Sequence, residues 1–254
     1  MRYDNSLKKN SPNRMNHLGA AVGFNPDADN IKTTLDHYFD GPILTPSPFD
    51  VQIGEQTLPL DALGRLSGCP AGGSVSVDPD PEAIYLTVRH SHHIKNTRGN
   101  RNFVEIRRGD EGYFLYLDYI WYADTCPKGF GAVAFLRMAR EAQRLGFTEI
   151  NLLAAGGSGI KLLPSQAWDE HYWGYEYWPR LGFDAQLQPV MLELTTKLPH
   201  LAHMTKVSQI VEADLPWWKE HGDGWEMSFD LTPSSASWDT LNKFISERGL
   251  QNEN

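Results

Sequence analysis

The chain has 254 residues, 41% of them hydrophobic, and a net charge of −9. This length and composition suffice for one sizeable folded domain, and an acidic chain without a lysine- or arginine-rich block argues against a nucleic-acid surface. The acidic balance suits a cationic amine as a partner, and it equally serves solubility. No stretch approaches the roughly 18 apolar residues of a membrane span, so we expect no membrane segment.

The amino-terminal residues 1–16 are polar and lack the apolar segment of a secretory signal. We expect residues 1–26 to be a flexible lead-in to a single domain over 27–254. The two cysteines, Cys69 and Cys126, are too few for a disulfide scaffold, which favours a reducing cytoplasm.

The first elements of the domain are weakly marked. Apolar residues at helical spacing predict a helix over 27–39, and alternating apolar residues predict a strand or hairpin over 51–60. The segment 68–82 is rich in glycine, proline and aspartate, and we interpret it as an irregular loop.

Strands and one long helix follow. Strands are predicted over 83–90, 101–108 and 112–122, with an antiparallel turn at 110–112. An amphipathic helix pattern then leads to Gly146, which is placed to end the helix in a left-handed conformation. Another strand pattern follows directly over 148–154, so these elements form a strand–helix–strand crossover.

The carboxyl-terminal part is expected to extend the domain over about 200–254. We predict a strand over 188–195, with 207–211 pairing near it. A final helix is predicted over 238–248, and Ser237 is its expected N-cap.

The most informative run is 125–131, between the long strand and the long helix. Gly129 and Gly131 let the backbone turn tightly and point successive N–H groups outward, and the helix adds the positive end of its dipole. A phosphate or pyrophosphate would fit there. The same run also suits a plain strand-to-helix turn, because Gly-x-Gly alone is a weak signal.

With its flanking elements this run resembles the GNAT N-acetyltransferase superfamily, whose Arg/Gln-x-x-Gly-x-Gly/Ala turn holds the pyrophosphate of acetyl-coenzyme A. The matching letters are Cys-Pro-Lys-Gly-Phe-Gly over 126–131, and the helix closes on Leu-Gly-Phe as in that family. Tyr-Trp-Pro-Arg-Leu-Gly-Phe over 177–183 is similar to a second family motif, aromatic-Tyr-x-x-Leu-Gly-Phe. The resemblance covers roughly 102–190. A dinucleotide-binding fold is disfavoured, because its fingerprint is Gly-x-Gly-x-x-Gly with a later acidic residue.

The resemblance implies an α/β (α+β) fold with a GNAT-like, mixed and mostly antiparallel twisted sheet, flanked by helices and carrying N- and C-terminal additions. It implies an enzyme that moves acetyl, or another acyl group, from coenzyme A to an amine on a small molecule or peptide. In the family a strand amide, near Trp121 here, binds the acetyl oxygen, and the two strands splay where the pantetheine arm enters. The implied cofactor-binding residues are Trp121, Tyr122, Ala123, Lys128, Gly129, Phe130, Gly131 and Ala132.

Asp118 and Tyr177 are two candidates for catalytic groups. Asp118 is the carboxylate on the long strand and can take the amine proton, although a structural salt bridge to Arg107 or Arg89 is an equal alternative. Tyr177 is the candidate acid, since Trp178 stands where the family often has the tyrosine that protonates the coenzyme A thiolate.

A histidine cluster supplies the third candidate. His90 and His92 would share one face of a strand, so His92 can be a general base, or the pair with Glu105 can bind zinc. A strand end that carries polar residues into solvent explains the same pattern. No further ligand has diagnostic spacing, so we expect no metal.

Two other functions stay open. Cys126 replaces the polar residue of the family turn and Trp178 replaces the tyrosine, which also fits a protein that binds coenzyme A or a protein partner without catalysis. The aromatic residues of 168–178 would suit a toxin- or effector-type acetyltransferase that acts on a macromolecule. The acceptor, the acyl group and the oligomeric state are not fixed by the sequence.

Overall fold

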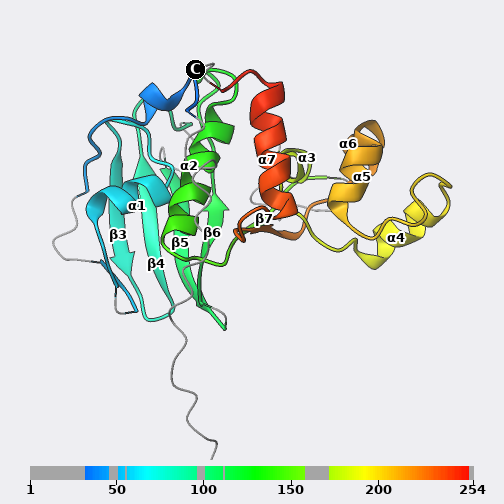
Figure 1. Ribbon diagram of the computed structural model, residues 1–254, viewed down its shortest axis with the longest axis horizontal. Coiled ribbons are helices and arrows are strands. Elements are labelled where there is room, and N and C mark those ends of the chain that lie inside the picture. The colour runs from blue at the N-terminus through cyan, green and yellow to red at the C-terminus, as the bar shows by residue number, and fades with distance from the viewer. Residues whose placement is uncertain are drawn as a thin grey trace, which may run out of the picture.

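One open β-sheet of six strands forms the centre of the protein (Figure 1). The computed structural model describes residues 32–45, 51–54, 56–95, 101–110, 112–157 and 172–251. The sheet has the order β3 (Ser74–Pro79), β4 (Ala83–Arg89), β5 (Arg101–Gly109), β6 (Gly112–Tyr119), β7 (Glu149–Leu153) and β8 (Glu226–Asp230). A separate two-stranded sheet pairs β1 (Val51–Ile53) with β2 (Gln56–Leu58).

The described residues also form seven α-helices, so the fold is mixed α/β. They are α1 (Leu60–Leu66), α2 (Phe130–Arg144), α3 (Gly174–Arg180), α4 (Pro189–Thr196), α5 (Val207–Ala213), α6 (Leu215–His221) and α7 (Ala236–Glu247). None of these helices is long and apolar enough to cross a membrane. Of the helix predicted over 27–39, the described part contains only the 3-10 turn η2 (Asp36–Tyr38), and 27–31 lie outside the described residues.

Strands β3 to β6 form an antiparallel meander. The strands predicted over 83–90 and 101–108 are confirmed as β4 and β5, and the turn predicted at 110–112 joins β5 to β6. Strand β6 ends at Tyr119, earlier than predicted. The hairpin predicted over 51–60 is confirmed as β1 and β2.

Strand β3 shows that the interpretation of 68–82 as an irregular loop was wrong. The strand contains the alternating letters Ser-Val-Ser-Val, and Val75 is fully buried opposite Val88 of β4. The alternating pattern therefore indicates a strand, and the surrounding glycines and prolines mark the limits of that strand.

The predicted strand–helix–strand crossover is confirmed as β6, α2 and β7, with β7 parallel to β6. Helix α2 lies across one face of the sheet beside α1 and α7 (Figure 1), and its apolar stripe is buried from Phe130 to Ala142. Gly146 follows the helix with φ of +77°, the left-handed conformation predicted for it. The crossover therefore places the N-terminus of α2 beyond the carboxyl end of β6.

The two strands predicted in the carboxyl-terminal part are wrong, because 188–195 lies in α4 and 207–211 lies in α5. Pro189 occupies the first turn of α4, where its missing N–H leaves no intrahelical bond unmade. The buried residues Met191 and Thr195 are four positions apart, which is the spacing of one helix face. The burial of these two residues at helical spacing therefore explains why the segment forms a helix.

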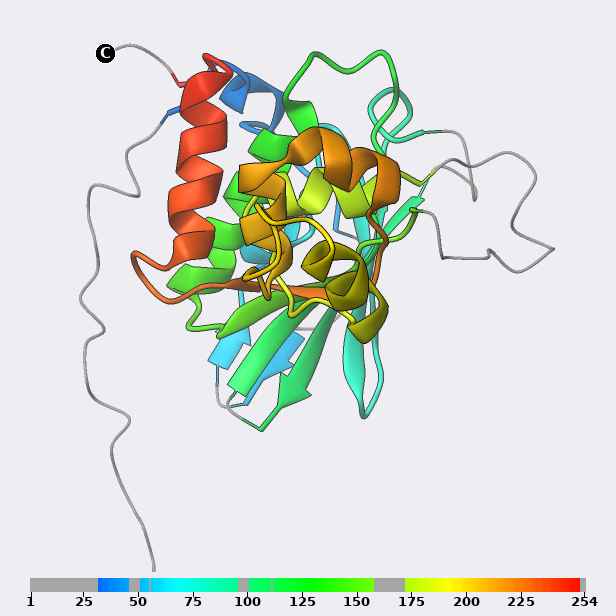
Figure 2. The same ribbon diagram turned by 90° about the vertical axis from the view of Figure 1, so that its right-hand side faces the viewer.

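The final helix predicted over 238–248 is confirmed as α7, which begins at Ala236. Its N-cap residue is Ser235, whereas the Ser237 hydroxyl accepts a hydrogen bond from the Asp230 amide. Helices α4, α5 and α6 form a lobe beyond the sheet edge at β8 (Figure 1), and Figure 2 looks onto this lobe.

One buried carboxylate joins α1 to α2. The Glu141 side chain is 5% exposed and accepts hydrogen bonds from Arg65 of α1, at 2.8 Å, and from Arg144 of its own helix. Burial opposes ionisation of Glu141, but the bonds from the two guanidinium groups outweigh burial and lower its pKa. The carboxylate therefore stabilises the contact between the two helices.

We predict that Glu141→Gln lowers the free energy of unfolding at neutral pH by about 2 kcal/mol, because the charge-assisted hydrogen bonds from the two guanidinium groups are weakened. A carboxylate whose folded pKa is lowered contributes stability that is lost as the pH falls through that pKa. The difference between variant and wild type should therefore shrink in acid. Urea unfolding of both proteins over a series of pH values measures it, and a constant difference contradicts the assignment.

Candidate functional site at the start of helix α2

Strands β6 and β7 part before β6 ends. Their parallel pairing stops at Leu117↔Leu152. Just beyond, the register of β6 against β5 shifts and leaves Asp118 as an extra, bulged residue. A bulge bends its strand and increases its twist, so β6 turns away from β7 here. The continuation of β7 bonds elsewhere, because the Ala154 amide donates to the Trp225 carbonyl at 3.0 Å.

The continuation of β6 is fastened on the side away from β7. The Trp121 amide donates to the side-chain oxygen of Asn102 at 2.9 Å, and the Ala123 amide donates to the His93 carbonyl at 2.9 Å. The Trp121 amide, which the resemblance assigned to the acetyl oxygen, is therefore already used inside the chain.

The intervening amides face the other way. Successive amides of an extended strand alternate in direction, so those of Ile120 and Tyr122 point toward the edge that β7 has left. Neither of these two amides has an acceptor among the described residues. The parting of β6 and β7 thus leaves backbone donors at the opening, and Ile120 joins Tyr122 as a candidate contact.

The first turn of α2 holds further unused donors. Gly129 precedes the helix with φ of +90°, which favours glycine. The Phe130 amide donates to the Pro127 carbonyl at 3.1 Å. Four other amides of the turn have no acceptor in the described part of the chain, those of Lys128, Gly129, Gly131 and Ala132. Ala132 is fully buried, so its amide, one of the orphan donors that every helix has in its first turn, is not open to a ligand in this structure.

Two side chains approach the glycines of this turn. Leu250 packs on Gly129 so closely that a Cβ at Gly129 would lie 2.6 Å from a Leu250 methyl carbon. A Cβ at Gly131 would lie 3.1 Å from the Tyr177 hydroxyl, so the missing side chain lets the phenol reach the helix. Leu250 therefore covers one side of the turn, while the Lys128 side chain is exposed.

Tyr177 and Trp178 point in different directions from α3. The Trp178 ring packs in the core against Phe135 and Phe183, whereas Tyr177 approaches the first turn of α2. Burial raises the pKa of Tyr177 to about 12, so the phenol keeps its proton at neutral pH. Its hydroxyl makes no hydrogen bond to a described residue. The structure thus brings the predicted acid to the predicted cradle.

Cys126 and His93 meet at the edge of the turn. The Cys126 Sγ lies 3.7 Å from His93 Nδ1 and 3.5 Å from the His93 carbonyl oxygen. Burial raises the pKa of the Cys126 thiol and lowers the pKa of the His93 imidazole, so both groups are neutral. The pair therefore fastens the loop after β4 to the turn and is not a thiolate nucleophile.

The other two predicted catalytic residues are exposed and lie on segments other than α3. Asp118 is exposed in the bulge, four residues before Tyr122, which is roughly 13 Å of extended chain. His92 is exposed in the turn after β4, so the prediction that it shares a strand face with His90 is wrong. The structure gathers one of the three candidates, Tyr177, at the first turn of α2.

The groups considered for zinc are used inside the chain. His90 Nδ1 accepts hydrogen bonds from two amides of the following turn, so its Nε2 carries the hydrogen shared with the Ala71 carbonyl at 3.1 Å. Glu105 is ion-paired to Arg107 at 2.7 Å. Over the described ranges, no three potential metal ligands gather.

Sequence reasoning missed Asn102, His93 and Leu250. Asn102 is 1% exposed and lies opposite Val88, but it stands next to Arg101 in a strand that also contains Glu105, so the sequence does not single it out. His93 belongs to the cluster that was noticed, but the choice fell on His92. Leu250 gives no local signal, because its contact with Gly129 joins distant parts of the chain.

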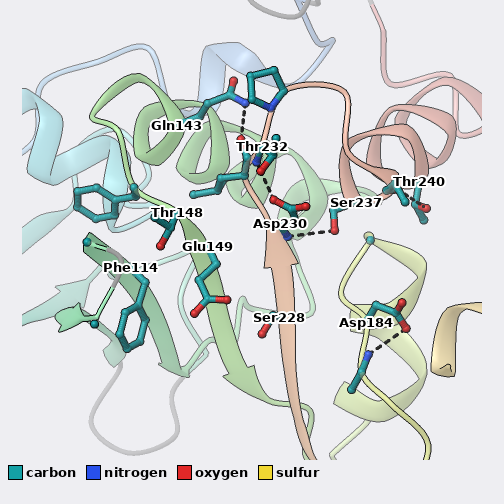
Figure 3. Close-up of a pocket in the computed structure, with 18 of the residues that line it drawn as sticks. Phe114, Gln143, Thr148, Glu149, Asp184, Ser228, Asp230, Thr232, Ser237 and Thr240 are labelled. Atoms are coloured by element: carbon teal, nitrogen blue, oxygen red, sulfur yellow. Dashed lines mark hydrogen bonds between the residues drawn. The ribbon is translucent and has the colours of Figure 1, made fainter. Parts of the chain in front are cut away.

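A second concave region lies at the other end of α2, roughly 22 Å along the helix (Figure 3). Its volume is about 1180 Å³, and polar side chains such as Glu149 line it. Several are bonded within the chain, since Gln143 donates to the Leu231 carbonyl at 2.7 Å and Asp230 accepts from the Thr232 amide at 2.8 Å. The charged residues of its lining are three cations and four carboxylates, and this end of α2 carries the negative pole of the helix dipole, so the region has no excess of positive charge for a diphosphate.

Neither a family model nor a curated protein sequence matches the chain. The likeness of 126–131 and 177–183 to GNAT motifs stays a prediction. The functional inference rests on the unused amides, the parting of β6 from β7 and the place of Tyr177.

We predict that Tyr177→Phe makes the protein more resistant to alkali. Burial raises the pKa of Tyr177 from its usual 10.0 to about 12, so its contribution to stability is present below the unfolded pKa and is lost as the pH rises through the folded one. Phenylalanine cannot ionise, so the variant's free energy of unfolding should fall less steeply over that range. Urea unfolding at several alkaline pH values measures the slopes, and equal slopes would show that the phenol is not buried.

Proposed function

We propose that the protein is a divergent member of the GNAT superfamily that transfers acetyl, or another acyl group, from coenzyme A to an amine. The observation that carries this proposal is the set of unused backbone donors that runs from the parted end of β6 to the first turn of α2. The order of elements also supports it, because an antiparallel meander leads into a parallel crossover, and the next helix presents Tyr177 to the turn.

The first turn of α2 would hold the diphosphate of coenzyme A. The amides of Lys128, Gly129 and Gly131 are donors, and the helix dipole favours an anion there. The exposed Lys128 side chain adds a positive charge in a chain whose net charge is −9. The pantetheine arm would then follow the opening between β6 and β7, where its amide groups can pair with the amides of Ile120 and Tyr122.

Acyl transfer needs a neutral amine, a polarised thioester carbonyl and a proton for the leaving thiolate. In the proposed reaction the amine attacks the carbonyl carbon, the C–N bond forms and the C–S bond breaks. An unused amide at the opening polarises the carbonyl oxygen, and Tyr177 gives its proton to the thiolate. Asp118, which is exposed near the start of the opening, takes the amine proton through water.

A protein that binds coenzyme A without catalysis is the second candidate. Leu250 covers one side of Gly129, and the proposed base and acid lie apart on the chain. Both features suit a binding site that has no turnover. The two candidates share the diphosphate site and differ in the release of a free thiol.

We predict that acetyl-coenzyme A binds the wild-type protein in calorimetry and that Lys128→Glu weakens the binding about tenfold, or about 1.4 kcal/mol. The reason is that a carboxylate replaces an ammonium group beside the diphosphate. Lys243→Glu is the matched control, since it makes the same charge change at an exposed position of α7, where the effect is screened. Equal losses in both variants would assign the effect to net charge, and no binding by the wild type would refute the site.

We predict that Tyr177→Phe lowers kcat about 100-fold while the Kd for acetyl-coenzyme A stays nearly unchanged, because the phenol donates a proton and does not hold the diphosphate. Thiol release with a panel of amines measures kcat. Tyr175→Phe is the matched control on the same helix, since the Tyr175 hydroxyl donates to the Lys219 carbonyl. An unchanged kcat in Tyr177→Phe removes Tyr177 as the acid, and binding without thiol release by the wild type favours the second candidate.

A further inference from the structure

Leu250 packs beside the proposed diphosphate site. Leu250 is 7% exposed, and two of its methyl carbons lie 2.6 and 2.7 Å from the position that a Cβ on Gly129 would take. Only glycine leaves room for this contact. The Leu250 side chain therefore lies where a side chain of residue 129 would point, beside the residue whose amide is a proposed diphosphate donor.

Short backbone contacts hold Leu250 in this place. Its amide donates to the Ile245 carbonyl at 3.1 Å, and its carbonyl accepts from the Thr34 amide at 2.9 Å. Gln251 forms an isolated antiparallel bridge with Thr33. We call Leu250 and Gln251 the terminal plug.

The segment that receives the terminal plug is tied to α2 more firmly. Arg137 of α2 is ion-paired with Asp36 at 3.2 Å and with Asp40 at 2.8 Å. The rings of Phe39 and Phe130 pack with centroids 4.8 Å apart. The terminal plug is held to this segment by the Leu250 side chain, the hydrogen bond to Thr34 and the bridge to Thr33, without an ion pair in the described residues, so we expect it to detach while the segment stays on α2.

We infer that the terminal plug is an autoinhibitory element, which closes the first turn of α2 until coenzyme A displaces it. This inference rests on the proposed function. A leucine side chain is stabilised by burial and offers no hydrogen-bond acceptor, whereas a diphosphate accepts from the unused amides. The site thus favours its ligand, but the apparent affinity is lowered by the free energy needed to expose Leu250.

The first test removes the plug's side chain in the full-length chain. Calorimetry with coenzyme A should show that Leu250→Ala binds about tenfold more tightly than the wild type, because less apolar surface has to be exposed on binding. Leu194→Ala is the matched control, since Leu194 is an exposed leucine on α4, and its affinity should equal that of the wild type.

The second test locks the plug. The bridge between Thr33 and Gln251 brings their Cα atoms to a spacing that suits a disulfide, so the double variant Thr33→Cys/Gln251→Cys can be oxidised and reduced. Coenzyme A should bind about tenfold more weakly to the oxidised form than to the reduced form of the same protein. Wild-type protein taken through the same treatments controls for the native cysteines.

The outcomes distinguish a failure of the autoinhibition proposal from a failure of the proposed binding site. Equal affinities in Leu250→Ala, the wild type and both redox forms overturn the plug and leave the proposed function standing. Weaker binding by Leu250→Ala also overturns it, because the leucine then supports the ligand. If no form binds coenzyme A, the proposed function fails and the plug fails with it. Should Leu250→Ala not fold, the redox comparison alone decides.

Discussion

The side-chain oxygen of Asn102 takes the hydrogen bond of the Trp121 amide, and the end of β6 depends on this contact. Together with the bulge at Asp118, it turns the strand away from β7 and leaves the Tyr122 amide facing the gap. Asn102 is 1% exposed, and its Nδ2 has no acceptor in the part of the chain that is described. A half-satisfied buried amide costs about 1–3 kcal/mol, so the residue is better explained by the strand geometry that it fixes than by stability.

Helix α2 carries this geometry to a second set of donors. The first turn of α2 follows the segment after β6. The two glycines in this turn allow Leu250 and Tyr177 to approach the helix backbone. Its far end is anchored to α1 through Glu141, which keeps the helix in place on the sheet. The two ends differ in electrostatics, because the positive pole lies at the glycines and the negative pole lies at the concave region around Gln143. An anionic ligand is therefore directed to the first turn.

The parts of the fold that follow from local pattern could be predicted from the sequence. The hairpin β5–β6, the crossover through α2 and the left-handed Gly146 each follow from periodicity and turn chemistry within a short stretch. The prediction for residues 188–195 was wrong, because a short apolar run has the same composition in a strand and in a helix, and only the burial of Met191 and Thr195 on one face shows the helix. Strand β3 was hidden by the glycines and prolines around it.

The candidate site could likewise be predicted only where a local sequence motif marks it. The turn 126–131 and Tyr177 were found because motif letters mark them, and the structure places both together. The contacts of Asn102 with Trp121 and of Leu250 with Gly129 depend on the tertiary fold, and no pattern in the sequence predicts them. Asp118 was predicted from its place on the long strand and His92 from a strand face shared with His90, and the structure shows both residues exposed, with His92 in a turn.

The most direct test of the central claim is an NMR titration of the backbone amides with coenzyme A. If the first turn of α2 holds the diphosphate, the largest shifts will fall on Lys128, Gly129 and Gly131, with smaller ones at Ile120 and Tyr122. Shifts confined to the concave region at the other end of α2, or no shifts at all, would contradict the account.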